Sequence, residues 1–244
     1  MSYREDPDLD FLAICSDEEL NDLVECLTKS PTGSLKTSKE YKANFPHHSK
    51  YWKLIAEEMQ LFGGNSFANL IRGGNGVLYK EILCDVCNNL KVNFNKDSET
   101  ILIEEYLFQH ILTSSFSKMS EDEKKAFFID FLEENQYGDI KKFTPQFLLG
   151  AFQTIFKANG FASYKLSVYV ANLIWKQVFG KGLSLAFNST ITKGLSLLSG
   201  PVGWSLTAIW TAIDLSGPAY RITIPAVVQI AMLRQKKLYE NKRN

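Results

Sequence analysis

One stretch of this sequence, residues 194–233, is almost free of charge: its only charged residues are Asp214 and Arg221. Three prolines interrupt the stretch, namely Pro201, Pro218 and Pro225. A helix that is apolar on all sides must be enclosed by protein or by lipid. The stretch is therefore predicted to form either the buried centre of a helical domain or a segment that enters a bilayer.

The proline spacing argues against a simple membrane-spanning helix. Pro201 and Pro218 leave 16 residues between them, which corresponds to about 24 Å of helix, less than the roughly 30 Å hydrocarbon layer. Asp214 and Arg221 are expected to be buried and paired with each other or with another polar group, because an unpaired buried charge is costly. Gly203, Thr207 and Thr211 form one row of small residues at helical spacing, and Ala208, Ala212 and Ser216 form another, which would allow helices to approach closely. Further structural or functional candidates in the stretch are Gly200, Gly217 and the three prolines.

The charge is divided unevenly along the chain. After Lys142 there are eleven basic and two acidic side chains, a net charge of +9, and because the whole chain is balanced the first part carries −9. We therefore divide the chain into an acidic helical part, residues 1–142, and a basic, apolar helical part, residues 143–244. Such asymmetry indicates contact either with an anionic surface or between the two parts.

The helix signals predict an all-α fold. A capping box is expected from Ser16 to Glu19 and another from Ser120 to Glu123, because Ser and Glu three residues apart can bond each other's backbone N–H groups. Thr144 followed by Pro145 is a further helix start. Gly63 and Gly64 are expected to end a helix that runs through Tyr51 to Met59. No strand pattern competes with these signals.

The first residues favour a cytoplasmic protein. The sequence MSYREDPDLDFLAICSDEEL has no basic n-region and no apolar h-region, which excludes a signal peptide. The four cysteines show no disulfide framework, so buried, reduced thiols are expected. The basic second part would allow a location at the inner face of the membrane.

Two segments carry a resemblance to a known family. They are LFGGNSFANLIRGGNGVLYKEILCDVCNNLKV and GPVGWSLTAIWTAIDLSGPAYRITIPAVVQIAMLR. Both are similar to the bacterial YaaW-like proteins, a family grouped with the ubiquinol-cytochrome c chaperone proteins, and the opening YREDPDLDFLAICSDEELNDLVECLT resembles a module found in the same group. The resemblance covers most of the chain and implies a helical protein that binds other proteins. It carries over no catalytic residue.

Motifs of catalytic and metal sites are weak in this sequence. Cys84 and Cys87 have the CxxC spacing but lie inside a predicted helix, so a structural role is expected rather than a redox or zinc site. Gly73 and Gly74 could cradle phosphate, but no strand or P-loop context accompanies them, and a connecting turn is the better interpretation. His47 and His48 precede a helix, but no recognisable nucleophile or carboxylate motif surrounds them. No metal and no cofactor are predicted.

The leading hypothesis is a non-enzymatic interaction protein. Its basic, apolar helices would engage an anionic membrane surface or self-associate, and the acidic part would restrain them. The alternative is a helical chaperone or assembly factor that keeps the apolar stretch in its core and binds protein clients. Nucleic acid is not an expected partner, because the −9 part would repel it and no RNA motif is present. An enzyme is the third possibility, since no constellation of acid, base and nucleophile is visible.

Overall fold

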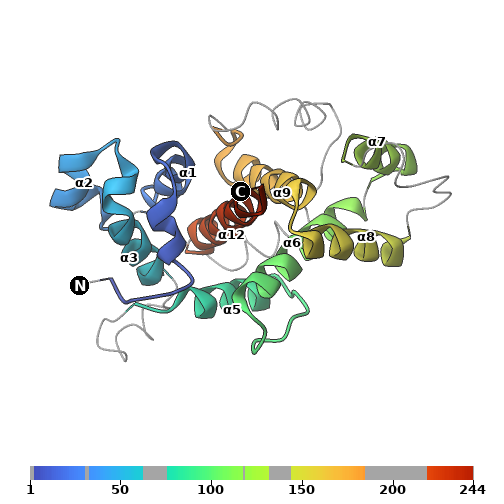
Figure 1. The fold of residues 1–244 in the computed structure, drawn as a ribbon, viewed down its shortest axis with the longest axis horizontal. Coiled ribbons are helices and arrows are strands. Elements are labelled where there is room, and N and C mark those ends of the chain that lie inside the picture. The colour runs from blue at the N-terminus through green and yellow to red at the C-terminus, as the bar shows by residue number, and fades with distance from the viewer. Residues whose placement is uncertain are drawn as a thin grey trace.

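The computed structural model describes residues 3–30, 33–62, 76–117, 119–131, 144–184 and 219–243 (Figure 1). Within these ranges the regular structure is helical, with no strand, so the predicted all-α class is confirmed. No helix in the described ranges is long and apolar enough to cross a membrane.

The first described part contains short helices that pack side by side. The 3-10 helix η1 (Asp10–Ile14) leads into α1 (Asp17–Leu27), and after η2 (Leu35–Thr37) come α2 (Lys39–Asn44), η3 (His48–Tyr51) and α3 (Trp52–Phe62). The predicted capping box of α1 is present: the Glu19 backbone N–H donates to Ser16 Oγ, and the Ser16 N–H donates to the Glu19 carboxylate. Helix α3 is described as far as Phe62, and Gly63 and Gly64, where its end is predicted, lie outside the described residues.

Three helices follow in the middle of the chain. They are α5 (Tyr79–Asn89), α6 (Thr100–Phe116) and α7 (Glu121–Phe131). Helix α6 has buried residues around most of its circumference, because α5 and α12 pack on it as well as α8 and α9. The predicted capping box from Ser120 to Glu123 starts α7.

Helices α8 (Pro145–Ala158) and α9 (Phe161–Phe179) form a consecutive pair. Thr144 Oγ1 accepts a hydrogen bond from the Phe147 N–H, and Pro145 occupies the first turn, as predicted. Asn159 ends α8 and Gly180 ends α9, both in the left-handed conformation that closes a helix C-terminus.

Helix α12 (Tyr220–Arg243) runs through the centre of the molecule in Figure 1. It packs against α9 and α1, and also against α5, α6 and α3. Its residues from Ile222 to Leu233 are buried in one continuous run. The apolar residues 222–233 of the stretch are thus a helix enclosed by protein.

Pro225 lies inside α12 and is buried there, so the expectation that this proline divides the stretch into separate pieces is wrong. Proline removes one backbone N–H, whose acceptor in a regular helix would be the carbonyl of Arg221. Arg221 lies in the first turn and is exposed. The missing hydrogen bond to its carbonyl therefore costs little, and the packing of the rest of the helix outweighs that cost.

Candidate functional site: the groove between η1 and α12

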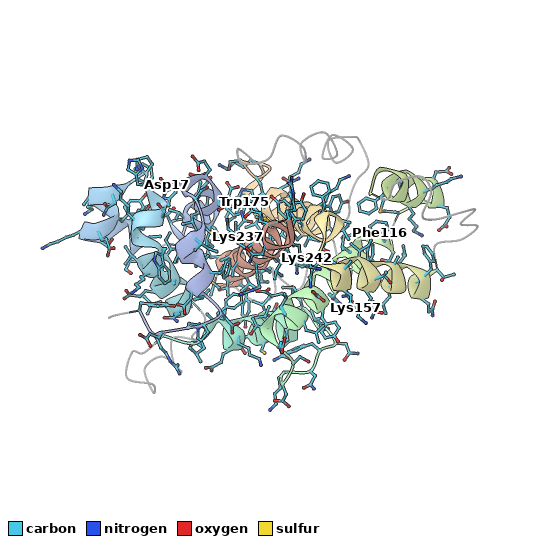
Figure 2. The ribbon with its side chains drawn as sticks, in the orientation of Figure 1. Asp17, Phe116, Lys157, Trp175, Lys237 and Lys242 are labelled. Carbon is cyan, nitrogen blue, oxygen red and sulfur yellow. The ribbon has the colours of Figure 1, made fainter. Side chains whose placement is uncertain are left out.

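Several basic side chains of α12 contact neighbouring helices; Lys237 and Lys242 are labelled in Figure 2. Lys242 Nζ donates to the Ala158 carbonyl, 2.6 Å away at the end of α8. Lys181, just after α9, pairs with Glu25 of α1 at 2.7 Å. These contacts join the basic part of the chain to itself and to the acidic part.

Glu19 is the acidic centre of one such contact. It is buried on α1 and pairs with both Lys236 and Lys237; its distance to Lys237 is 2.9 Å. Glu240 pairs with the same two lysines. Burial would raise the pKa of Glu19, but the hydrogen bonds from the two lysines outweigh burial and hold this pKa below its usual value. The cluster therefore keeps Glu19 ionised and neutralises two cations of α12.

A second buried network surrounds Arg234. Its guanidinium group donates to Glu104 at 2.8 Å and to the Asp8 carbonyl at 2.6 Å, and it lies 4.5 Å from the centre of the Phe11 ring. The Tyr79 hydroxyl donates to the other Glu104 oxygen at 2.7 Å. Burial raises the pKa of the fully buried Glu104, and the Arg234 charge offsets this only in part. Both carboxylate oxygens of Glu104 are occupied by these bonds, so the network connects α5, α6 and α12 with the N-terminal segment.

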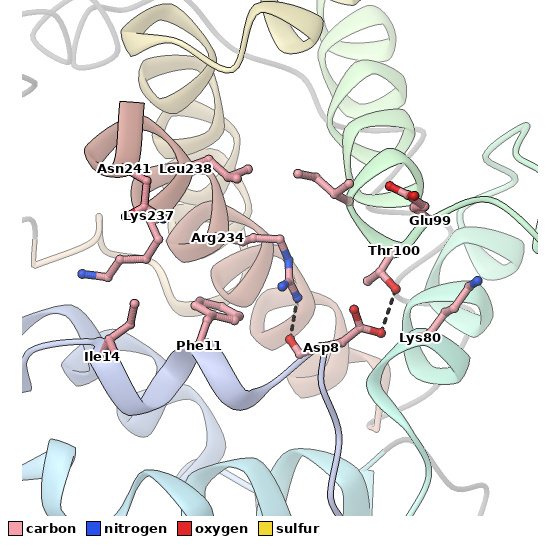
Figure 3. Close-up of a pocket in the computed structure, with 11 residues that line it drawn as sticks. Asp8, Phe11, Ile14, Lys80, Glu99, Thr100, Arg234, Lys237, Leu238 and Asn241 are labelled. Atoms are coloured by element: carbon pink, nitrogen blue, oxygen red, sulfur yellow. Dashed lines mark hydrogen bonds between the residues drawn. The ribbon is translucent and has the colours of Figure 1, made fainter. Parts of the chain in front are cut away.

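The Arg234 network forms one wall of a groove of about 610 Å³, shown in Figure 3. In Figure 3 the Asp8 side chain accepts a hydrogen bond from Thr100, and Lys80 and Glu99 lie on the same side of the opening. The groove is lined by η1, the starts of α5 and α6, and the last turns of α12. Its described lining residues are Asp8, Phe11, Ile14, Lys80, Glu99, Thr100, Ile101, Arg234, Lys237, Leu238 and Asn241.

The chemistry of the groove suits binding better than catalysis. Phe11, Ile14 and Leu238 give it an apolar lining, and Ile14 is 64% exposed although it is a large hydrophobic side chain. Among the described residues, Lys80 and Glu99 form no ion pair. An apolar surface with one free charge of each sign can hold a segment of another protein through burial and two peripheral ion pairs.

Most of the candidate residues from the sequence lie outside the described ranges, namely Gly63, Gly64, Gly73, Gly74, Gly200, Pro201, Gly203, Asp214, Gly217 and Pro218. Arg221 is described and exposed, so the expectation that it is buried is wrong. It stands in the first turn of α12, directly before the buried run that begins at Ile222, where water can solvate its charge.

The cysteines agree with the structural role expected for them. All four are free thiols; Cys15, Cys26 and Cys87 are buried and Cys84 is half-buried. Burial raises the pKa of both Cys84 and Cys87, which opposes the thiolate form that redox chemistry and metal binding require.

Sequence reasoning missed Glu19, Glu104 and Arg234 as members of buried networks. One signal was present: Glu104 and Glu105 are the only acids in the helix from Thr100 to Phe116, which is otherwise largely apolar. A charge on the buried side of such a helix requires a partner. The partner lies 130 residues away, so the sequence could indicate that it exists without identifying it.

Comparison with known proteins supports the resemblance found in the sequence. Residues 47–228 match a family model described as ubiquinol-cytochrome C chaperone, and residues 3–33 match one described as a domain of unknown function, DUF3944. No solved structure was found to match the chain.

Relatives of this chain include proteins of Helicobacter pylori and Escherichia coli. A UPF0174 protein of Helicobacter pylori is 46% identical, with 99% of this chain and 96% of the relative covered, and a second from the same organism is 43% identical over 81% of this chain and 94% of the relative. The UPF0174 protein YaaW of Escherichia coli is 34% identical, with 96% of each chain covered. On these similarities, the chain belongs to the UPF0174 (YaaW) family.

Proposed function

We propose that this protein is a non-enzymatic helical chaperone or assembly factor that binds a segment of a client protein in the groove between η1 and α12. The observation that carries the proposal is the groove itself. It combines an apolar lining with an exposed Ile14 at its edge, which gives an apolar surface that a segment of another protein could cover. The match of residues 47–228 to the ubiquinol-cytochrome C chaperone model supports the same class of function.

The charges around the groove define the client segment. Lys80 and Glu99 would pair with one acid and one base of the client, and Phe11, Ile14 and Leu238 would cover its apolar side chains. Rim ion pairs contribute mainly to orientation and association rate, whereas the buried apolar contacts supply most of the affinity. A segment with two or three apolar side chains between charges of opposite sign fits this description.

Membrane binding restrained by the acidic part is the second candidate. The observation that favours it is Glu19, buried between Lys236 and Lys237, because this carboxylate withholds two cations from any anionic surface. The same observation reduces the attraction of the intact chain for lipid. The client-binding proposal is therefore the better supported one for the protein as it stands.

The experiment measures aggregation of denatured citrate synthase, a model client, in the presence of the full chain. The wild type is expected to suppress aggregation, and Ile14→Asp to lose this effect because it places a charge at the apolar edge. The matched control is Phe45→Asp, since Phe45 is 56% exposed but lies outside the groove. Unchanged suppression by Ile14→Asp, or no suppression by the wild type, would contradict the proposal.

Two further measurements test the other possible partners, a membrane surface and a second copy of this chain. Flotation with phosphatidylglycerol vesicles tests the second candidate. If that candidate holds, Glu19→Gln should bind the vesicles at low salt, and the binding should weaken as salt rises. Sedimentation of the wild type and of Ile14→Asp tests self-association, because a dimer that only the wild type forms would make a second copy the occupant of the groove. Either result would replace the client-binding proposal.

A further inference from the structure

A second cavity, of about 470 Å³, lies on another part of the molecule, and its role is independent of the proposed function. It is enclosed by the segment between α5 and α6, one face of α6, and one face of α8. Its described lining residues are Val92, Asn93, Phe94, Asn95, Tyr106, Gln109, His110, Thr113, Leu149 and Gln153. Its volume falls within the range of about 300–1,000 Å³ that is usual for small-molecule sites.

Helix α6 contributes a row of hydrogen-bonding side chains to the cavity. Tyr106, Gln109, His110 and Thr113 are spaced i, i+3, i+4 and i+7, so they share one face of the helix. Gln109 is only 4% exposed, and within the described part of the chain its carboxamide makes no hydrogen bond. The buried Thr113 hydroxyl also has no partner there. Buried polar groups are normally satisfied, so the Thr113 hydroxyl indicates a missing partner, and the Gln109 carboxamide beside it can bond a ligand in the cavity.

The cavity carries no net charge. None of its described lining residues is Asp, Glu, Lys or Arg. His110, the one titratable imidazole, has its pKa lowered by burial, although a hydrogen bond to the Leu90 carbonyl opposes this, so the ring is neutral at neutral pH. A charged ligand would lose its hydration there without gaining a counter-charge.

The opposite wall is polar and open to solvent. Asn93, Asn95 and Gln153 are exposed and bring three carboxamides to the entrance, and Phe94 and Leu149 add apolar surface between them. A carboxamide both donates and accepts hydrogen bonds, and so does a hydroxyl group. The site thus offers alternating donors and acceptors beside aromatic and aliphatic side chains.

We propose that this cavity binds a small uncharged polyhydroxylated molecule, a sugar of one or two rings. Each sugar hydroxyl can both donate to and accept from a carboxamide, which would satisfy Gln109 and Thr113 at the floor and Gln153 at the entrance. The C–H faces of a sugar ring would lie against Phe94 and Tyr106. A phosphorylated or carboxylated sugar would be excluded, because the cavity has no cation to receive it.

The test is saturation-transfer NMR on the full chain with glucose, N-acetylglucosamine and trehalose as probes, and glucose 6-phosphate as the charged counterpart. At least one neutral sugar is expected to bind saturably, and the phosphorylated sugar to bind at least tenfold more weakly. Gln109→Met should weaken the neutral sugar at least tenfold, which corresponds to about 1.4 kcal/mol. The matched control is Gln177→Met on α9, an exposed glutamine outside the cavity, which should bind as the wild type does.

A second variant guards against misfolding of the buried substitution. Gln153→Ala lies at the exposed wall, should keep the thermal unfolding midpoint of the wild type, and should also weaken sugar binding. The proposal is overturned if no neutral sugar binds, if the phosphorylated sugar binds equally well, or if binding is the same in Gln109→Met and Gln153→Ala as in Gln177→Met. Uridine binding in place of every sugar would overturn the sugar class as well. None of these results alters the client-binding groove, whose test uses Ile14.

Discussion

Removal of the negative charge at Glu104 should destabilise the protein strongly. Glu104 is fully buried, and its Oε2 atom lies 2.8 Å from Arg234 Nε. Glu104→Gln keeps the shape of the side chain and can still accept from Tyr79, but it removes the carboxylate that pairs with Arg234 and leaves that charge with Asp8 and aromatic rings. Breaking one partner of a buried pair costs about 3–5 kcal/mol. In a chain of this size, that loss lowers the thermal midpoint by about 6–20 °C.

Urea unfolding followed by far-UV circular dichroism measures this free energy. The matched control is Glu121→Gln, which breaks the contact of Glu121 with Lys124 on α7; Glu121 is an exposed carboxylate, and the cost should stay below about 1 kcal/mol. The double variant Glu104→Gln/Arg234→Met should lose less than the sum of its two single variants, because it leaves no unpaired buried charge. If Glu104→Gln shifts the midpoint no more than Glu121→Gln does, the Arg234 network does not stabilise the fold.

Three further predictions concern other parts of the chain. Burial, and to a smaller extent the neighbouring Glu104, raises the pKa of Glu105 from 4.5 to about 7. Between about pH 4.5 and pH 7 the folded state therefore keeps a proton that the unfolded state releases, so the stability measured in urea should fall as pH rises through this range. The fall should be smaller in Glu105→Gln. Gly76→Ala would place a Cβ 2.6 Å from a Cβ atom of α3 and should cost about 1–3 kcal/mol by calorimetry, whereas Gly150→Ala meets nothing within 4 Å and should gain about 0.5–1 kcal/mol. Replacing Cys84 and Cys87 together by Ala should leave the zinc content of the purified protein unchanged and lower only its stability; zinc that is stoichiometric in the wild type and lost in the variant would contradict the structural role.

Local features of the fold could be predicted from the sequence because their partners lie within a few residues. The bonds between Ser16 and Glu19, between Ser120 and Glu123, and from Phe147 to Thr144 each join residues three apart. The helical class follows from the same short-range signals. The uneven distribution of charge is visible in the sequence, and contact between the two parts of the chain was one of its two possible explanations.

The features that could not be predicted depend on distant residues. Lys236 and Lys237 meet a carboxylate more than 200 residues earlier, and neither the sign nor the spacing of the charges selects Glu19 from the other acids. Arg221 was expected to be buried because it interrupts an apolar run, but a charge at the end of such a run can lie outside it. The cavity beside α6 could not be predicted because its carboxamides form no sequence motif and only packing brings them together.

The position of α12 has a consequence for how the protein is made. Residues 220–243 are synthesised after every element they pack against, so the apolar faces of α1, α5, α6 and α9 leave the ribosome before the helix that covers them. Until translation passes Arg243, the parts of those faces that α12 covers stay exposed and can associate wrongly with other chains. A translational stop anywhere before residue 220 would therefore yield a product that aggregates or is degraded, and not a smaller folded domain.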